Sequence, residues 1–311
     1  MKPIVHILAA VLAWSMADAA QADQPADADR WRAAMEAARW TGPLLASTAE
    51  TLPQGHVYTE PYFFDGISGG EHSPGTSGFY QYGLTDNYTI GVQPFFSLGT
   101  RKFNRELAIG DSKLVSQVRV SHFTAQHRVP SVALVMNLVI PTGKSDHLAA
   151  LKEGHGGGAF APEIGINVQQ YFLLGNGRLL RARINILERV PLSEQVSGRS
   201  VFGTGPDFRG HAKPGAKTTL IGGVEYSLTK EWVLALDVER DQWGRTRVTG
   251  RDGAGPLVTQ ISPSSWNIGF APAVEYNWSD RAGIIAGVWI VPRGHNTQSS
   301  VTPAIAIQRF W

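Results

Sequence analysis

The segment LIGGVEYSLTKEWVLALDVE, residues 220–239, contains the pattern that decides the fold. Large apolar residues such as Trp232, Leu234 and Leu236 recur at every second position, and small, polar or charged residues stand between them. A period of two is the side-chain period of a β-strand with one apolar face. The residues at 228–231 form a short connection between two such stretches. The segment therefore predicts an antiparallel hairpin with one apolar and one polar face.

The same alternation predicts about twelve strands between residue 55 and the end of the chain. They are expected at residues 55–64, 77–83, 88–97, 113–122, 130–140, 159–173, 178–190, 216–228, 231–243, 265–278, 281–292 and 300–311. Short connections at 84–87, 123–128, 174–177, 228–231 and 278–281 alternate with long loops near 65–77, 98–112, 141–158, 191–215, 244–263 and 293–299. This rhythm is typical of an outer-membrane barrel, whose periplasmic turns are short and whose external loops are long.

Aromatic residues gather near the predicted short turns, as an aromatic girdle would. They are Tyr82, Tyr88, Tyr226, Trp232, Tyr276 and Trp278. A soluble β-sandwich, the alternative fold, explains the strands but neither these positions nor the long and short rhythm. The chain also ends in an alternating strand with Phe310 and Trp311, which resembles the assembly signal of outer-membrane barrels. We therefore expect an all-β fold, a transmembrane antiparallel up-and-down β-barrel in the outer membrane of a Gram-negative bacterium.

The composition excludes several classes of protein. The chain of 311 residues has no cysteine, which excludes a disulfide framework, a thiolate zinc site and a cysteine nucleophile. Its formal net charge of +2 is too small and dispersed for a nucleic-acid surface. The most continuous apolar run after the N-terminus, residues 282–292, is far shorter than the roughly 20 residues of a membrane helix. Membrane residence would therefore require a barrel, and neither a metal nor a cofactor is expected.

Two regions precede the barrel, which is expected over residues 55–311. Residues 1–22 predict a secretory signal peptide, with cleavage after Ala19 or Ala22. In residues 23–54 a short helix is expected to run to Trp40 and to end at Thr41-Gly42-Pro43.

Residues 23–54 permit two interpretations. They fold into the barrel as a plug, or they remain a disordered or periplasmic segment. The candidate plug residues are Trp31, Trp40, Gly42, Pro43, Leu44 and Leu45.

Ten charged residues fall on the polar side of the predicted strands. They must face the lumen, because a charge facing lipid near the midplane is costly, by about 2–4 kcal/mol for Arg or Lys and somewhat less for Asp or Glu. Together they form either a constriction that filters solutes by charge or a salt-bridge network that fills the lumen. Arg181 and Arg183 repel each other and require carboxylate partners or an anionic passenger. The ten candidates are Glu60, Lys113, Arg119, Glu163, Arg181, Arg183, Glu225, Asp237, Glu239 and Glu275.

No motif indicates catalysis. The glycine-rich stretch at 153–158 lacks the spacing of a phosphate-binding loop, and no helix follows the G-x-S-x-G match at 66–70. Histidines and carboxylates expected at the outer rim show no triad or metal spacing. They are His72, His147, His155, His211 and His295, with Glu71, Asp146, Glu153 and Asp207. The protein is therefore not expected to be an enzyme, and a rim-active lipid hydrolase is kept as an alternative.

Several short motifs carry a family resemblance over roughly residues 40–311. They are TGPLL at 41–45, ETLPQGH at 50–56, EPYFF at 60–64, YGLTDN at 82–87 with GV at 91–92, and PTGK at 141–144. They resemble the outer-membrane proteins of the MetA pathway of phenol degradation, often called simply transporters. The chain is more distantly similar to the FadL-type channels for hydrophobic compounds, without ligand residues to carry over. The resemblance implies a barrel and an association with aromatic-compound breakdown.

These patterns together predict a channel for passive uptake of small molecules, with aromatic or hydrophobic ones as the favoured class. No nucleotide-binding or energy-coupling motif is visible. A non-conducting structural or adhesive barrel is the competing class. The expected partners are outer-membrane lipid and lipopolysaccharide, the barrel assembly machinery and a small-molecule solute, with no nucleic acid.

Overall fold

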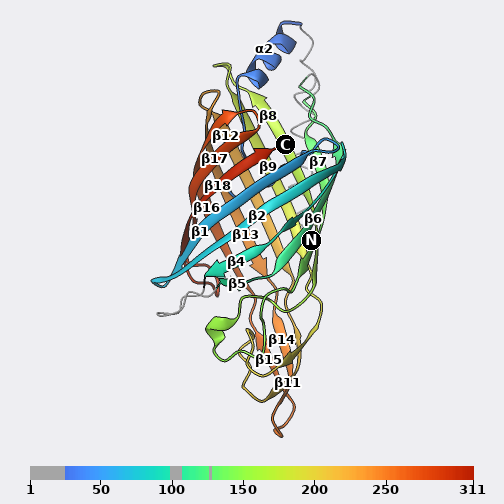
Figure 1. Ribbon diagram of the computed structural model, residues 1–311, viewed down its shortest axis with the longest axis vertical. Helices are drawn as coiled ribbons and strands as arrows, with labels where there is room; N and C mark the ends of the chain where they lie inside the picture. Colours follow the sequence, from blue (N-terminus) through green and yellow to red (C-terminus); the bar gives the residue numbers. More distant parts are fainter. Residues whose placement is uncertain (1–24, 99–106, 126–127) are drawn as a thin grey trace.

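The computed structural model describes residues 25–98, 107–125 and 128–311. The predicted signal peptide, residues 1–22, lies outside the described residues. In the described part, twelve antiparallel strands form a closed barrel (Figure 1). They are β1 (Val57–Ser68), β2 (Glu71–Thr85), β3 (Tyr88–Gln93), β6 (Ser112–Ser121), β7 (Ser131–Ile140), β8 (Ala161–Leu173), β9 (Leu179–Arg189), β12 (Lys217–Ser227), β13 (Trp232–Trp243), β16 (Ser265–Ser279), β17 (Ala282–Val291) and β18 (Ser300–Phe310).

The barrel closes where its first strand pairs with its last. β1 and β18 are antiparallel neighbours, with Tyr58 opposite Phe310 and Ile67 opposite Val301. The predicted strand at 88–97 is divided by Pro94 into β3 and β4 (Phe95–Leu98), because proline has no N–H for the ladder. β5 (Leu107–Ile109) pairs with β4.

The two faces of each barrel strand have opposite character. Along β13, Leu234, Leu236 and Val238 are exposed, whereas Val233 and Asp237 are buried. The apolar residues therefore cover the outside, where lipid replaces water, and the polar residues face the lumen. Among the described residues, no helix has the length and apolar character needed to cross a membrane.

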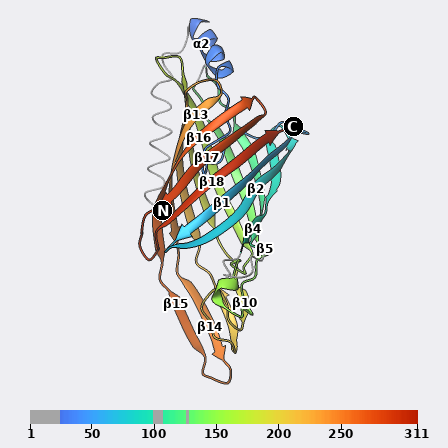
Figure 2. The same ribbon diagram turned by 60° about the vertical axis from the view of Figure 1, so that its left-hand side comes forward.

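The two ends of the barrel differ (Figures 1 and 2). The helix α2 (Pro25–Glu36) lies beyond the end with the short turns, which is the periplasmic end. The predicted helix was too long. The chain leaves α2 at Glu36, and the amide of Arg39 instead donates to the carbonyl of Lys230 in a periplasmic turn, at 3.0 Å.

The external loops contain more regular structure than the sequence predicts. A four-stranded sheet forms from β10 (Glu194–Ser197), β11 (Phe208–Lys213), β14 (Thr246–Asp252) and β15 (Val258–Ser262). Val196, Phe208, Ala212 and Val248 bury one of its faces in a small apolar cluster. The short 3-10 helix η2 (Leu151–Glu153) lies in the preceding loop.

The prediction of a long loop at 65–77 is wrong. β1 and β2 continue their pairing to Ser68 opposite Glu71. They are joined by Gly69 and Gly70, whose φ angles of 58° and 81° suit the tight turn favoured by right-twisted hairpins.

The lipid-facing assignment is testable by placing a charge at two depths. We expect Leu236→Arg, in the middle of β13, to lower the free energy of unfolding by about 2–4 kcal/mol. Leu228→Arg, in the turn before β13, should lower it by no more than about 1 kcal/mol. Urea titration of the barrel in lipid vesicles measures both values. Equal effects at the two positions would contradict the assignment.

Candidate functional site

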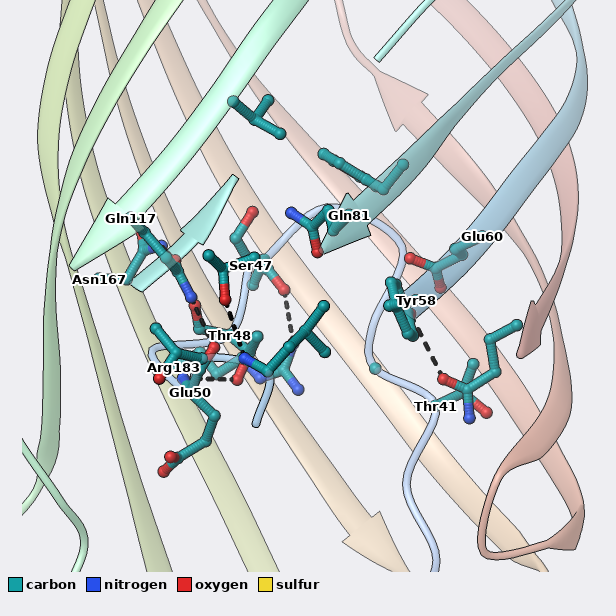
Figure 3. Close-up of a pocket in the computed structure, with 18 of the residues that line it drawn as sticks. Thr41, Ser47, Thr48, Glu50, Tyr58, Glu60, Gln81, Gln117, Asn167 and Arg183 are labelled. Carbon is teal, nitrogen blue, oxygen red and sulfur yellow. Dashed lines mark hydrogen bonds between the residues drawn. The ribbon is translucent and has the colours of Figure 1, made fainter. Parts of the chain in front are cut away.

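Residues 37–54, which we call the lumen segment, begin and end at short turns of the periplasmic end and line the interior of the barrel between Trp40 and Pro53 (Figure 3). This segment forms neither helix nor strand, so its backbone N–H groups need partners from the wall. The amide of Thr41 donates to Glu275 Oε2 at 2.7 Å, and the amide of Leu45 donates to Asp237 Oδ2 at 2.8 Å. Two of the predicted lumen carboxylates therefore hold backbone amides.

Wall side chains also donate to carbonyl groups of the lumen segment. Arg183 Nη1 donates to the carbonyl of Ala46 at 2.7 Å. The Asn185 side chain binds both backbone groups of Ser47. Its Oδ1 accepts from the Ser47 amide at 2.8 Å, and its Nδ2 donates to the Ser47 carbonyl at 2.9 Å. One asparagine thus replaces the two backbone bonds that a neighbouring strand would supply.

Glu50 binds the C-terminal part of the lumen segment to the barrel wall. Its carboxylate pairs with Arg119 Nη1 at 2.6 Å and accepts a hydrogen bond from the hydroxyl of Ser131. Gln117 Nε2 donates to the Glu50 carbonyl at 2.5 Å. Arg119 was a predicted lumen residue, whereas Glu50 was not proposed because no strand alternation marks it.

Arg39 forms ion pairs with Asp280 and Glu231 at the periplasmic mouth. Arg39 Nε lies 2.5 Å from Asp280 Oδ1 in the turn between β16 and β17. The hydrogen bond from Arg39 and its positive charge lower the pKa of Asp280 below its ordinary value.

The two arginines that sequence analysis singled out share one carboxylate. Arg181 donates to Glu225 through Nε at 2.7 Å and through Nη2, and Arg183 Nε lies 3.3 Å from Glu225 Oε2. All three side chains are buried. The guanidinium of Arg181 also lies 4.5 Å from the ring centroid of Trp40. The repulsion between the arginines is thus offset by a carboxylate of the wall.

Near the external mouth, Glu163 binds two cations. Lys113 Nζ lies 3.2 Å from Glu163 Oε1, and Arg189 Nη2 lies 2.7 Å from Oε2. A second pair, Lys217 with Asp241, has a distance of 2.8 Å. Arg189, Lys217 and Asp241 were not proposed, although they share the alternation of the residues that were.

A cavity of about 440 Å³ remains between the lumen segment and the wall. Glu60, only 7% exposed, lines it together with the aromatic rings of Tyr58, Tyr62 and Phe79 (Figure 3 shows Tyr58 and Glu60). Glu239, the last of the ten predicted lumen residues, is equally buried on β13. The lining of the cavity therefore combines aromatic rings with an acidic group.

The candidate plug residues divide between two places. Trp40, Gly42, Pro43, Leu44 and Leu45 belong to the lumen segment and line the cavity. Trp31 instead lies on α2, with its ring centroid 5.7 Å from that of Phe123 in the turn before β7.

Close packing of the lumen segment depends on small residues. Leu44 packs against the wall at Ala235, Ala273 and neighbouring apolar residues. Gly83 on β2 is required because a Cβ there would lie 2.1 Å from the carbonyl oxygen of Pro53. The segment thus fits against the wall where side chains are short.

The predicted girdle residues lie at the short-turn end on the outward side of their strands. Tyr82, Trp232, Tyr276 and Trp278 are exposed, and Tyr88 and Tyr226 are partly exposed. At the C-terminus, the Phe310 ring stacks on His56 at 5.0 Å, and the Trp311 amide donates to the carbonyl of Val57 at 2.9 Å. The terminal aromatic residues are therefore built into the barrel closure.

The rim histidines do not assemble a catalytic triad in the described part of the chain. His72 Nδ1 pairs with Asp65 at 2.6 Å, and His155 Nδ1 lies 3.1 Å from the hydroxyl of Ser97. No described carboxylate binds the other ring nitrogen of His155. Among the described residues, no cluster of His, Asp and Glu suits a metal ion.

One outer-loop carboxylate has a displaced titration. Burial raises the pKa of Glu194 to about 7, and the negative charges of Asp146 and Asp111 add to this effect. The carboxyl group of Glu194 can therefore take up a proton near pH 7.

The fold is similar to that of solved outer-membrane proteins. The COG4313 outer membrane channel from Pseudomonas putida F1 matches with a TM-score of 0.58 and 12% identity, over 88% of this chain and all of that one. The NanC porin (TM-score 0.48, 10% identity, 80% of this chain and 98% of that one) and a mutant of the TodX monoaromatic hydrocarbon channel (0.46, 13%, 88% and 96%) also match. The first likeness shows the fold of an outer-membrane barrel. The sequence matches no family model and no curated protein.

The shared carboxylate of Arg181 and Arg183 gives a stability prediction. We expect Glu225→Gln to lower the free energy of unfolding by about 3–5 kcal/mol, because it removes the carboxylate that two buried guanidinium groups share. The control is Glu231→Gln, since Glu231 is partly exposed and its Oε1 lies 3.9 Å from Arg39 Nη1. Its effect should stay below about 1 kcal/mol. Similar small effects of both substitutions, measured by urea titration, would contradict a structural role for Glu225.

Proposed function

We propose that the protein is an outer-membrane channel for passive uptake of small molecules, with aromatic and hydrophobic solutes as the favoured class and the lumen segment as its gate. The proposal rests on the hydrogen bonds that hold the lumen segment. Its backbone binds side chains such as Glu275, Asp237 and Asn185 rather than a strand ladder. Such bonds exchange for water at a net cost of about 0.5–1.5 kcal/mol each when both groups are neutral, and of about 1.5–3 kcal/mol when one group is charged. The segment is therefore separable from a barrel that stays closed.

The width of the barrel supports the same proposal. Eight strands enclose an interior that side chains alone can fill, and the diameter grows with the number of strands. Twelve strands leave more room, and here the lumen segment occupies it. Displacing the segment would leave a passage lined by charged groups and by the rings of Tyr58, Tyr62 and Phe79. The similarly folded protein of Pseudomonas putida is itself a channel.

A non-conducting barrel is the competing proposal. The two buried arginines favour it, because Arg183 donates to the carbonyl of Ala46 and Arg181 lies over the ring of Trp40. In such a barrel the same contacts would hold the lumen segment in place permanently. The two proposals therefore differ in whether this segment moves.

A reversible cross-link tests that difference. A Cβ built at Gly223 would lie 2.8 Å from the Cβ of Ala46 and closer still to Asp237 Oδ1. The Asp237 side chain must therefore turn aside for the two Cβ atoms to reach the separation of about 3.5–4.5 Å that a disulfide needs. The unmodified chain has no cysteine, so two introduced thiols can pair only with each other within one chain. For Ala46→Cys with Gly223→Cys in liposomes, we expect flux of the aromatic glucoside arbutin in the reduced state and loss of that flux after oxidation, because the cross-link fixes the lumen segment to the wall.

Each single cysteine variant is the control, and its flux should not respond to oxidant. Sucrose is the comparison solute, and its flux should be lower than that of arbutin. Absence of flux in the reduced, folded protein would favour the non-conducting barrel. Flux that oxidation leaves unchanged would rule out the lumen segment as the gate.

A further inference from the structure

Strands β11 and β14 continue the hairpin of β12 and β13 beyond the external rim, and we call this extension the external ribbon. Lys217 pairs with Trp243 inside the rim, and Lys213 pairs with Arg247 outside it, so the register does not change. The ladder also continues between them, because the Gly244 amide donates to the Ala216 carbonyl at 2.8 Å. In an extended ribbon, alternate residues keep to one side. The side that lines the lumen below is therefore continued outside the barrel.

Cations occupy this side of the external ribbon. Arg209 lies directly opposite Arg251, and Lys213 lies directly opposite Arg247. We call these four exposed residues the cation face. The other side of the ribbon is the one that packs into the apolar cluster around Phe208. The cation face is thus the open side of the sheet.

The neighbouring strands do not neutralise the cation face. On the same side, β10 supplies Gln195 and Ser197, and β15 supplies Thr259 and Ile261. Within the described residues, none of the four cations has an ion-pair or side-chain hydrogen-bond partner, in contrast to the paired cations of the lumen.

Two directly opposed like charges destabilise a pair of strands. The external sheet carries two such pairs, Arg209 with Arg251 and Lys213 with Arg247. Folding of the sheet does not require them, since its apolar cluster lies on the other side. The opposed cations are therefore suited to bind something outside the chain.

The charge along this side changes sign at the rim. Lys217, the last cation, pairs with Asp241 at 2.8 Å. Further into the lumen the same side presents Glu239, Asp237 and Glu225. Unpaired positive charge is thus confined to the external approach and does not extend through the barrel.

We propose that the cation face binds small organic anions with two or more carboxylates and concentrates them at the external mouth. Two opposed basic side chains can hold one carboxylate with charge-assisted hydrogen bonds, as a bidentate arginine does. The opposed pairs are four residues apart, or about 13 Å along a strand, so their long side chains must converge on a smaller anion held between them. A single exposed ion pair contributes only about 0–1 kcal/mol, so a multivalent anion fits this arrangement better than a monovalent one.

The electrostatic field of the cation face would also attract anions from solution. A concentrated charge of one sign can raise association rates by about 10- to 1,000-fold, and salt suppresses this effect. The role in uptake rests on the proposed channel function. The binding itself does not.

The test is calorimetric titration of benzene-1,3,5-tricarboxylate into the refolded full chain in a nonionic detergent. We expect saturable binding that weakens at least about fivefold between about 20 and 200 mM salt. Arg209→Gln with Arg251→Gln should raise the dissociation constant by about tenfold, because one opposed pair is lost. Since these side chains have no partners among the described residues, resistance of the external sheet to proteolysis should remain unchanged.

The matched control is Lys230→Gln with Arg281→Gln, which removes the same charge from exposed positions in periplasmic turns. Its dissociation constant should stay within about twofold of that of the unmodified protein. The uncharged comparison compound is benzene-1,3,5-tricarboxamide. An equal loss of affinity in both double variants, or binding of the tricarboxylate no tighter than that of the tricarboxamide, would overturn the proposal. Binding only to lipopolysaccharide micelles would also overturn it and would assign the cation face to glycolipid.

The arbutin flux experiment separates this inference from the channel proposal. Absence of flux with intact tricarboxylate binding would remove the transport role and leave the binding surface standing. Flux without such binding would overturn only the inference about the cation face.

Discussion

Lipid cannot form hydrogen bonds, so every backbone polar group in the membrane must find its partner within the protein. The pairing of β1 with β18 meets this constraint by removing both edges of the sheet. Closure then assigns each side chain to lipid or lumen, because successive residues of a strand point to opposite faces. The apolar exterior and the charged interior are thus two consequences of one closed ladder.

The charged interior in turn determines what the lumen can hold. Carboxylates such as Glu275 and Asp237 accept backbone amides of the lumen segment, and Arg183 donates to one of its carbonyl groups. An apolar lumen would leave this irregular backbone without partners, which would be costly. The same charges that a barrel must turn inward therefore supply the binding site for its own N-terminal region.

The lumen and the external ribbon use charge differently. Inside, Arg181 and Arg183 share Glu225, and Lys113 and Arg189 share Glu163. On the external ribbon, the opposed cations Arg209 and Arg251 have no such partner among the described residues. Buried charges must be paired to offset their desolvation, whereas exposed charges are stabilised by water and remain free to bind. Burial thus separates structural charge from charge available to a ligand.

The alternation of residue types determined the barrel strands and their inward faces. The prediction of a strand at 216–228 differs from β12 by one residue at each end, because period-two alternation is a local signal. Long-range contacts were not predictable in this way. The pairing of β11 with β14, and the contact of Glu50 with Arg119, join residues far apart in the chain without a local pattern that specifies the partner.

The sequence by itself therefore determined a barrel with a charged lumen, because both follow from the order of neighbouring residues. Only the tertiary structure decided which charges pair, that the lumen segment lines the interior of the barrel, and that the loop strands stack the cations of the external ribbon on one side. Those outcomes depend on which strands become neighbours when the sheet closes, and closure is a property of the whole chain.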